Sequence, residues 1–211
     1  MNEELTRDYA ALLDRARRTV LPAVGDAHDG RRGDGTPDAT APALRVKFLH
    51  FWGHTSRSGG VDKACFSQWW PAPFTVGDAT YATAEHWMMA RKARLFGDVG
   101  AENAVLTARS PAQAKAAGRL VHGFDDATWE RERFGIVVEG NVHKFSADPA
   151  LAAFLIGTGD RVLVEASPLD RIWGIGLAAD DPRASRPASW RGQNLLGFAL
   201  MATRDILRGA A

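Results

Sequence analysis

The sequence has a single cysteine, Cys65, among its 211 residues, so no disulfide can form within the chain. We therefore expect a reducing compartment. An excess of one charge is also absent, because 26 Lys and Arg residues stand against 25 Asp and Glu residues. This balance argues against a protein that coats nucleic acid or an anionic membrane, although a local basic groove remains open.

Long apolar runs are missing as well. No stretch of about 18 apolar residues occurs, so the sequence predicts no membrane span. The first segment, MNEELTRDYAALLDRARRTVL, is charged throughout and contains no apolar core of a secretory signal. We therefore expect a cytoplasmic protein.

The remaining composition fits a globular protein, with 45% hydrophobic and 24% charged residues. Apolar residues from Leu5 to Val20 recur at helical spacing, which predicts an N-terminal amphipathic helix over residues 1–22. Residues 23–43 are rich in Gly, Asp, Pro and Ala without apolar periodicity, which predicts a flexible linker. We expect a single compact domain over residues 44–211.

Turn and cap residues divide that domain into short elements. RVKFLHFWG (45–53) and RVLVEAS (161–167) are predicted strands, RIWGIGL (171–177) is predicted to be extended, and PFTVGDATYAT (73–83) is predicted to form a hairpin that turns at Gly77 and Asp78. Helices are predicted after Thr83, after Ser110 with Pro111 and a capping-box Gln113, over 125–145, after Asp148 with Pro149, and over 194–209. The result is a mainly helical α+β fold with short, scattered strands.

The stretch TAEHWMMARKARLFGD places Glu85 and Lys92 seven residues apart on one predicted helix. Because each residue turns a helix by about 100°, seven steps return to within about 20° of the start. The acid and the amine therefore share a face, with Met88 and Met89 near it. If that face is buried, the pKa of both groups shifts.

Two interpretations of this face are open. The chain has only five lysines against 21 arginines, and a lysine, unlike an arginine, can lose its proton and attack a carbonyl. Alternatively, Glu85 simply favours the helix dipole in the first turn. In that case Lys92 extends along the surface.

Other candidate groups lie outside this helix. In EASPLDRIWGIG, Asp170 stands near Trp173 in a Gly-containing loop after a strand, where acids often belong to sites, although Asp170 can also cap a turn. His54 follows the predicted strand of FWGH. The histidines show no zinc-site spacing, and one cysteine does not complete such a site. The sequence therefore indicates neither a metal nor an organic cofactor.

Taken in order, several segments resemble the YbiA-like or NADAR family over essentially all of Phe48 to Leu207. These segments are FWGH, FSQWWPAPFTVGDATYATAEHWMMARKA, SPAQAKAAGR, TWERERFGIVVEGNVHKFSADPALAAFLIGTGDRVLVEASPLDRIWGIG and GQNLLGFALMATRDIL. The resemblance implies a compact, mainly helical α+β fold and an N-glycosidase or an ADP-ribose-processing protein. One branch hydrolyses phosphoribosylamino-pyrimidine intermediates of riboflavin synthesis, and another removes ADP-ribose from guanine bases.

The resemblance also implies roles for individual residues. The family's acid falls on Glu85, its helix lysine on Lys92, its ring-stacking tryptophan on Trp129 and its late acid on Asp170. The segments WGIG and GQN place Trp173 and Asn194 in the pocket lining.

Three groups are predicted to hold a phosphate or ribose hydroxyls, namely His54, Arg119 and Asn194, with ordinary surface or capping roles as the alternative. The chain departs from the family at Trp87, Met88 and Met89, and in FSQWW where FSNFY is commoner. These departures bear on the choice of substrate.

These observations predict an N-glycosidase that cleaves the C–N bond between a ribose and a base, in a small phosphoribosyl or ADP-ribosyl compound. The alternative is a non-catalytic module that binds ADP-ribose or a related nucleotide. Action on an ADP-ribosylated nucleic acid is also open, because a flipped or single-stranded base can enter a pocket. The sequence carries no signature of oligomeric state.

Overall fold

The structure is a computed structural model that describes residues 47–56 and 59–209. The predicted N-terminal helix and linker lie outside the described residues, so these two domain predictions stay predictions. The helices are α2 (Ala84–Leu95), α3 (Val99–Leu106), α4 (Pro111–Gly118), α5 (Asp126–Ser146), α6 (Pro149–Ile156) and α7 (Leu195–Gly209). The strands are β1 (Phe48–Phe51), β2 (Phe74–Val76), β3 (Ala79–Tyr81) and β4 (Val162–Glu165), with short 3-10 turns at Lys63–Phe66 and Pro187–Ser189. The predicted mainly helical α+β fold is confirmed.

The described chain forms two compact units that interleave in sequence. One unit contains residues 47–50 and Gly159–Phe198, and the other contains Phe51–Thr158 together with α7 from Ala199 onward. We call them the loop unit and the helical unit. Within the described residues, no helix is both long enough and apolar enough to span a membrane.

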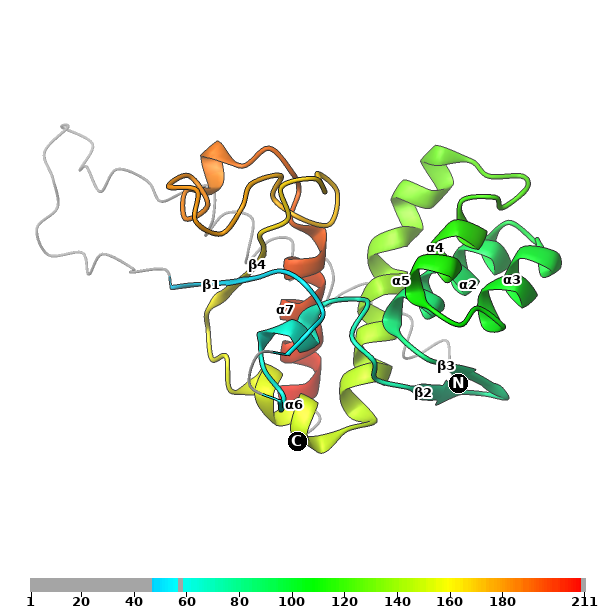
Figure 1. Cartoon of the computed structure of the whole chain (residues 1–211), viewed down its shortest axis with the longest axis horizontal. Coiled ribbons are helices and arrows are strands. Elements are labelled where there is room, and N and C mark those ends of the chain that lie inside the picture. The colour runs from blue at the N-terminus through cyan, green and yellow to red at the C-terminus, as the bar shows by residue number, and fades with distance from the viewer. Residues whose placement is uncertain (1–46, 57–58, 210–211) are drawn as a thin grey trace, which may run out of the picture. The chain divides into compact units, whose positions relative to one another are not determined.

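The helical unit is built around α2, with α3, α4 and α5 packed against it (Figure 1). Side-chain caps fix where these helices begin: Thr83 accepts the His86 N–H for α2, and Ser110 accepts the Gln113 N–H for α4. The predicted capping box at α4 differs in one detail, because the Gln113 side chain accepts the N–H of Arg109 rather than that of Ser110. Helix α3 was not predicted from the sequence, although Asp98 caps it through the Ala101 N–H.

An aromatic cluster joins the hairpin to α2 and α5. Strands β2 and β3 pair antiparallel around the predicted turn, where Gly77 has a φ of 58°. Phe74 and Tyr81, one from each strand, stack at 5.6 Å, and Trp87 of α2 lies edge-on to Tyr81 at 5.0 Å. His143 of α5 stacks on Phe74 at 6.2 Å. The three elements therefore share one buried cluster.

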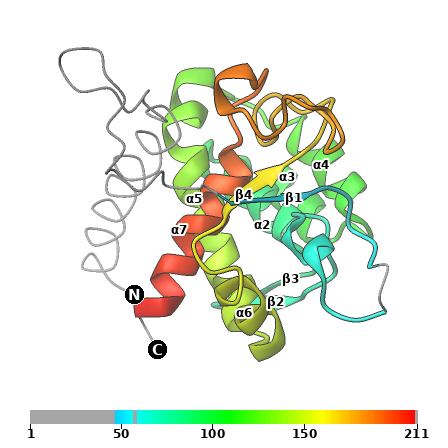
Figure 2. The same cartoon turned by 90° about the vertical axis from the view of Figure 1, so that its left-hand side faces the viewer.

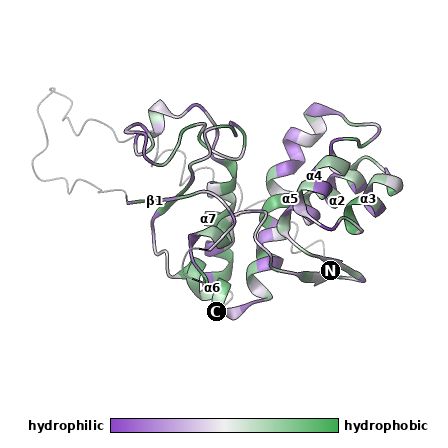
Figure 3. Ribbon diagram, viewed as in Figure 1, coloured by the Kyte–Doolittle hydropathy of each residue, from purple (hydrophilic) through white to green (hydrophobic). Residues whose placement is uncertain are grey.

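Helices α2 and α5 approach closely because α5 carries a glycine at their contact. A Cβ on Gly140 would lie 2.3 Å from Cδ1 of Trp87, well inside van der Waals contact. The Trp87 indole N–H donates to the Ile136 carbonyl of α5 at 2.8 Å. The absence of a side chain on Gly140 therefore provides the space that the Trp87 indole occupies. The first turns of α5, which contain the charged run ERER, are predominantly hydrophilic in Figure 3.

A fully buried lysine fastens the segment before the hairpin to α5. The Nζ of Lys144 donates to the carbonyls of Cys65, at 2.6 Å, and Ser67, at 2.9 Å. Burial lowers the pKa of Lys144 from 10.5 to about 7, and the nearby Cys65 acts weakly in the opposite direction. Burial also raises the pKa of the Cys65 thiol to about 12.

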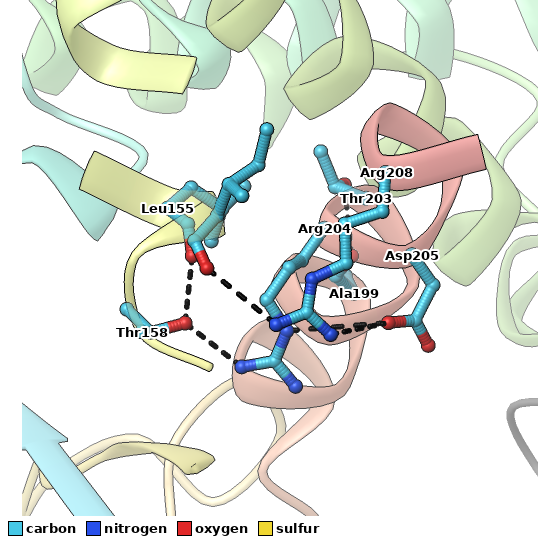
Figure 4. A network of polar contacts seen from close by, with 8 residues as sticks. Leu155, Thr158, Ala199, Thr203, Arg204, Asp205 and Arg208 are labelled. Atoms are coloured by element: carbon cyan, nitrogen blue, oxygen red, sulfur yellow. Dashed lines mark hydrogen bonds and ion pairs between the residues drawn. The ribbon is translucent and has the colours of Figure 1, made fainter. Parts of the chain in front are cut away.

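The C-terminal half of α7 belongs to the helical unit and contacts the end of α6 through polar groups (Figure 4). The buried guanidinium of Arg204 donates to Thr158 Oγ1 at 2.8 Å, and Thr158 Oγ1 donates to the Leu155 carbonyl at 2.7 Å. Arg208 reaches the carboxylate of Asp205 at 3.8 Å. The Thr158 hydroxyl therefore satisfies one of the last carbonyls of α6, and Arg208 also donates to the Ile156 carbonyl at 3.5 Å.

The loop unit is stabilised more by backbone hydrogen bonds between its loops than by helices or strands. Strand β1 pairs with β4 (Figure 2). The segment predicted to be extended, 171–177, forms successive bends instead. Its carbonyl groups accept hydrogen bonds from backbone N–H groups of residues 191–196, for example from the Asn194 N–H to the Gly174 carbonyl at 3.1 Å. The prediction of an extended segment is wrong, because Ile175 and Leu177 are buried by loop contacts rather than in a sheet ladder.

Replacing Gly140 should destabilise the fold. Gly140→Ala forces the added methyl group into the Trp87 indole, and overpacking of this kind costs about 1–3 kcal/mol. The control is Gly100→Ala in α3, where the nearest atom to the added methyl group is 3.4 Å away and the change favours the helix. Urea unfolding followed by circular dichroism gives both values, and equal stability of the two variants would contradict this packing.

The buried Lys144 should make stability rise with pH. Between pH 7 and 10.5 the unfolded chain binds a proton at this lysine that the folded chain does not, so the free energy of unfolding increases by up to about 1.4 kcal/mol per pH unit. Urea midpoints of wild type and Lys144→Met, measured from pH 6 to pH 9, should therefore diverge only above about pH 7. Lys63→Met, at an exposed lysine, is the control and should track wild type.

Candidate active site

Glu85 lies in the first turn of α2 and is buried, with 3% of its surface exposed. The cap at Thr83 leaves the Glu85 N–H outside the helix ladder, and this N–H donates to the Gln68 carbonyl at 2.9 Å. The position favours a carboxylate, because the N-terminal end of a helix carries partial positive charge. Met88, one turn further along the same face, is also buried, so the predicted face is a buried one.

Lys92 lies two turns further along α2 and is half-buried. Its Nζ donates to the carbonyl of Gly118, the last residue of α4, at 2.9 Å. The same atom lies 4.0 Å from the centroid of the Phe124 ring and 5.7 Å from that of Trp129. In this state the amine contacts one carbonyl and two ring faces rather than the Glu85 carboxylate.

Burial lowers the pKa of Lys92 from its ordinary value of 10.5, while the negative charge of Asp126 acts in the opposite direction. The amine is therefore easier to deprotonate than a lysine in water, which is the condition for a nucleophile.

The two rings near Lys92 come from the start of α5. Asp125 caps α5 through the Thr128 N–H, so Phe124 occupies the position before the cap and Trp129 the fourth position of the helix. These are the two positions of a hydrophobic staple. Trp129 was predicted as a site residue, whereas Phe124 and Gly118 were missed. The staple pattern around Asp125 is the sequence signal that points to Phe124.

A pair of buried amides lies beside the acid. The Asn141 side chain of α5 donates to Gln68 Oε1 at 3.3 Å, and the Gln68 side chain faces the Met88 sulfur at 3.8 Å. Since the Gln68 carbonyl also accepts the Glu85 N–H, this residue joins the first turn of α2 to α5. Gln68 and Asn141 were not predicted, although Gln68 is one of the three positions at which FSQWW differs from FSNFY.

Two of the residues predicted to bind phosphate or ribose are exposed side chains of the helical unit. His54 is exposed, and its ring lies 5.5 Å from that of Trp69. Arg119 is exposed at the C-terminus of α4, directly after the carbonyl that Lys92 contacts. Their binding roles stay predictions.

In the loop unit, Asp170 and Trp173 are joined directly. Asp170 Oδ1 accepts the N–H groups of Ile172 and Trp173, each at 2.8 Å, so the carboxylate caps the turn that carries Trp173. This is the structural role foreseen for Asp170, and it orients the carboxylate without excluding chemistry at its second oxygen. Trp173 is half-buried.

Asn194 has a mainly structural environment. It is fully buried, with a positive φ of 53°. Its Oδ1 accepts the Glu165 N–H and its Nδ2 donates to the Leu163 carbonyl, both at 2.9 Å. The amide therefore connects the start of α7 to β4, and its predicted contact with substrate stays a prediction.

The arrangement in the helical unit suits chemistry at a carbon that becomes positively charged. A buried carboxylate, a partly desolvated amine and a half-buried indole lie on or against one helix. Within the described residues, no group of three or more His, Cys, Asp or Glu residues has the geometry of a metal site.

Comparison with known proteins identifies relatives of this chain. A mimivirus protein named as an N-glycosidase, from Acanthamoeba polyphaga mimivirus, is 41% identical over 75% of this chain and 95% of its own length. A maize protein, the chloroplastic riboflavin biosynthesis protein PYRR, is 32% identical over 62% of this chain and 20% of its own length.

The fold has a solved counterpart in the NMR structure of the Escherichia coli protein YbiA. The two share a TM-score of 0.63 at 24% identity, over 79% of this chain and 88% of that one. The family model of the NADAR domain matches residues 50–208, which include every predicted site residue. The chain therefore belongs to the NADAR domain family.

Proposed function

We propose that this protein is an N-glycosidase that hydrolyses the bond between C1′ of a ribose and the nitrogen of a base. The observation that carries the proposal is the buried face of α2, where Glu85 and the desolvated amine of Lys92 stand two turns apart. Relatives named as N-glycosidases, and the family to which the chain belongs, support it.

Glu85 has the chemistry for the central step. Cleavage of a ribosyl C–N bond builds positive charge on C1′ and the ring oxygen, and a nearby carboxylate stabilises that charge or activates the attacking water. A buried carboxylate does this better than an exposed one, because the low local dielectric strengthens the interaction. The departing base needs a proton, which Asp170 or a water molecule supplies in this proposal.

Lys92 provides a covalent variant of the same reaction. Its neutral amine attacks C1′, and the bond from C1′ to the base nitrogen breaks as the base leaves with a proton. A proton then moves from the lysine nitrogen to the ring oxygen and the sugar ring opens, which leaves C1′ joined to Nζ as a Schiff base. Water adds to this C1′=N bond, the bond from C1′ to Nζ breaks, and the free amine and the sugar are released. The lowered pKa of Lys92 supports this route, because a larger fraction of the amine is neutral near physiological pH.

The proposed substrate is a small phosphoribosyl or ADP-ribosyl compound whose flat base stacks on Trp129. Stacking of a base on an aromatic ring contributes about 1–3 kcal/mol. A riboflavin-pathway pyrimidine is one candidate, supported by the maize relative's name. ADP-ribosylated guanine, free or in nucleic acid, is the other, and a cytoplasmic location suits either substrate.

Removing the carboxylate of Glu85 should abolish turnover while leaving binding. We expect Glu85→Gln to release free base about 10²–10⁴ times more slowly than wild type, since the amide carries no charge. The assay is chromatography of free base from a panel of phosphoribosylamino-pyrimidine, NAD, ADP-ribose and ADP-ribosylated guanine. Glu139→Gln, at a partly exposed acid of α5, is the matched control. Binding without release by the wild type would instead identify a nucleotide-binding module.

Borohydride should trap a sugar on Lys92. Reduction of a Schiff base during turnover leaves a stable secondary amine, so peptide mass spectrometry should find the sugar's mass on Lys92 alone. Lys92→Arg should give no adduct and little turnover, because a guanidinium does not form the Schiff base. Lys115→Arg, at a lysine of α4, should behave as wild type. Full turnover in Lys92→Arg without any adduct would rule out the covalent route and leave the direct attack of water.

A further inference from the structure

Three groups beside the half-buried Lys92 amine favour its protonated form and so act against burial, which lowers its pKa. The Phe124 ring face lies 4.0 Å from Nζ, within the range of a cation–π contact, and the Gly118 carbonyl accepts a hydrogen bond at 2.9 Å. Asp126, the first residue of α5, adds a negative charge nearby. These three groups attract an ammonium more strongly than a neutral amine.

A lysine that acts as a nucleophile must instead be in its neutral form. Attack on a carbonyl carbon uses the nitrogen lone pair, which a protonated amine lacks. The amine must also leave the ring and the Gly118 carbonyl in order to reach a second reactant. The observed contacts therefore fix the Lys92 amine in place and do not present it to a second reactant.

Phe124 is suited to this holding role by its position. It precedes the cap of α5, and its ring packs edge-on against Phe96, which follows α2, at 5.2 Å. The ring thus bridges the end of α2 and the start of α5. It is also 39% exposed, so its edge reaches the surface, where a ligand can displace it.

We propose that Phe124 is a positioning residue that holds the Lys92 amine in a resting place against the Gly118 carbonyl, from which the amine must be released before it attacks the sugar. The role of this release in catalysis rests on the proposed function, whereas the contact between Phe124 and the Lys92 amine does not depend on it. It can be measured without any substrate, from the reactivity of Lys92 toward a small aldehyde.

The experiment is trace reductive methylation with formaldehyde and cyanoborohydride at pH 8, quantified by peptide mass spectrometry. Phe124→Leu keeps apolar cover over the amine but removes the ring face. We expect Lys92 to react about fivefold faster in this variant, the change that corresponds to loss of one cation–π contact. Phe124→Met, an unbranched apolar replacement, should show the same increase, and Phe124→Tyr should restore the wild-type rate.

The chain supplies its own controls. Lys144 is fully buried and reports unfolding, because it reacts only if the helical unit opens. Lys115 reports the general reactivity of a lysine outside the contact. Leu120→Ala, at an exposed residue of the same connection, should leave Lys92 unchanged. An unchanged or slower rate at Lys92 in both Phe124→Leu and Phe124→Met, with Lys144 still protected, would overturn the proposal whether or not the protein proves to be a glycosidase.

Discussion

Burial of the charged face of α2 is the constraint on which the helical unit depends. An ionised group moved from water into an apolar interior loses several kcal/mol of solvation unless the protein replaces it. In this protein the groups that replace the lost water differ between the two ends of α2. Glu85 lies at the positive end of the helix dipole, whereas Lys92 meets a carbonyl, two ring faces and the charge of Asp126. The helix therefore holds an acid and an amine in one buried face.

The neighbours of α2 follow from that constraint. Helix α4 approaches closely because Gly118 has no side chain, and a Cβ there would lie 2.2 Å from the Met89 sulfur. Helix α5 approaches through Gly140 in the same way. The close approach brings the Gly118 carbonyl within reach of Lys92 and the amide of Asn141 within reach of Gln68. The Gly118 carbonyl thus takes the place of a water molecule at the Lys92 ammonium.

The elements that could be predicted from the sequence are those encoded locally. The caps at Thr83 and Ser110, the turn at Gly77 and the opening of α6 at Asp148 each depend on a few adjacent residues. The common face of Glu85 and Lys92 follows from helical periodicity, whereas the sequence left open its burial, which the structure shows as complete at Glu85 and partial at Lys92. The mainly helical α+β class follows from the same cap and turn residues.

What could not be predicted depends on contacts between distant segments. Phe124 and Gly118 meet Lys92 only because three helices converge, so neither the spacing within α2 nor the composition reveals them. The bends of 171–177 depend on backbone hydrogen bonds with residues 191–196, which no local pattern encodes. The two hydrogen bonds between the Asn194 side-chain amide and the backbone of β4 are likewise long-range contacts. The sequence analysis placed Asn194 in the lining of a pocket and did not predict these bonds.

The central claim is that the buried face of α2 receives the anomeric carbon of a ribose. A crystal structure with an iminoribitol, whose protonated ring nitrogen mimics the charge that develops on the sugar, tests it most directly. The account predicts that this nitrogen lies about 3 Å from a carboxylate oxygen of Glu85, with the sugar within reach of the Lys92 amine. An inhibitor bound away from α2, or bound with Glu85 covered by packed side chains, would contradict it.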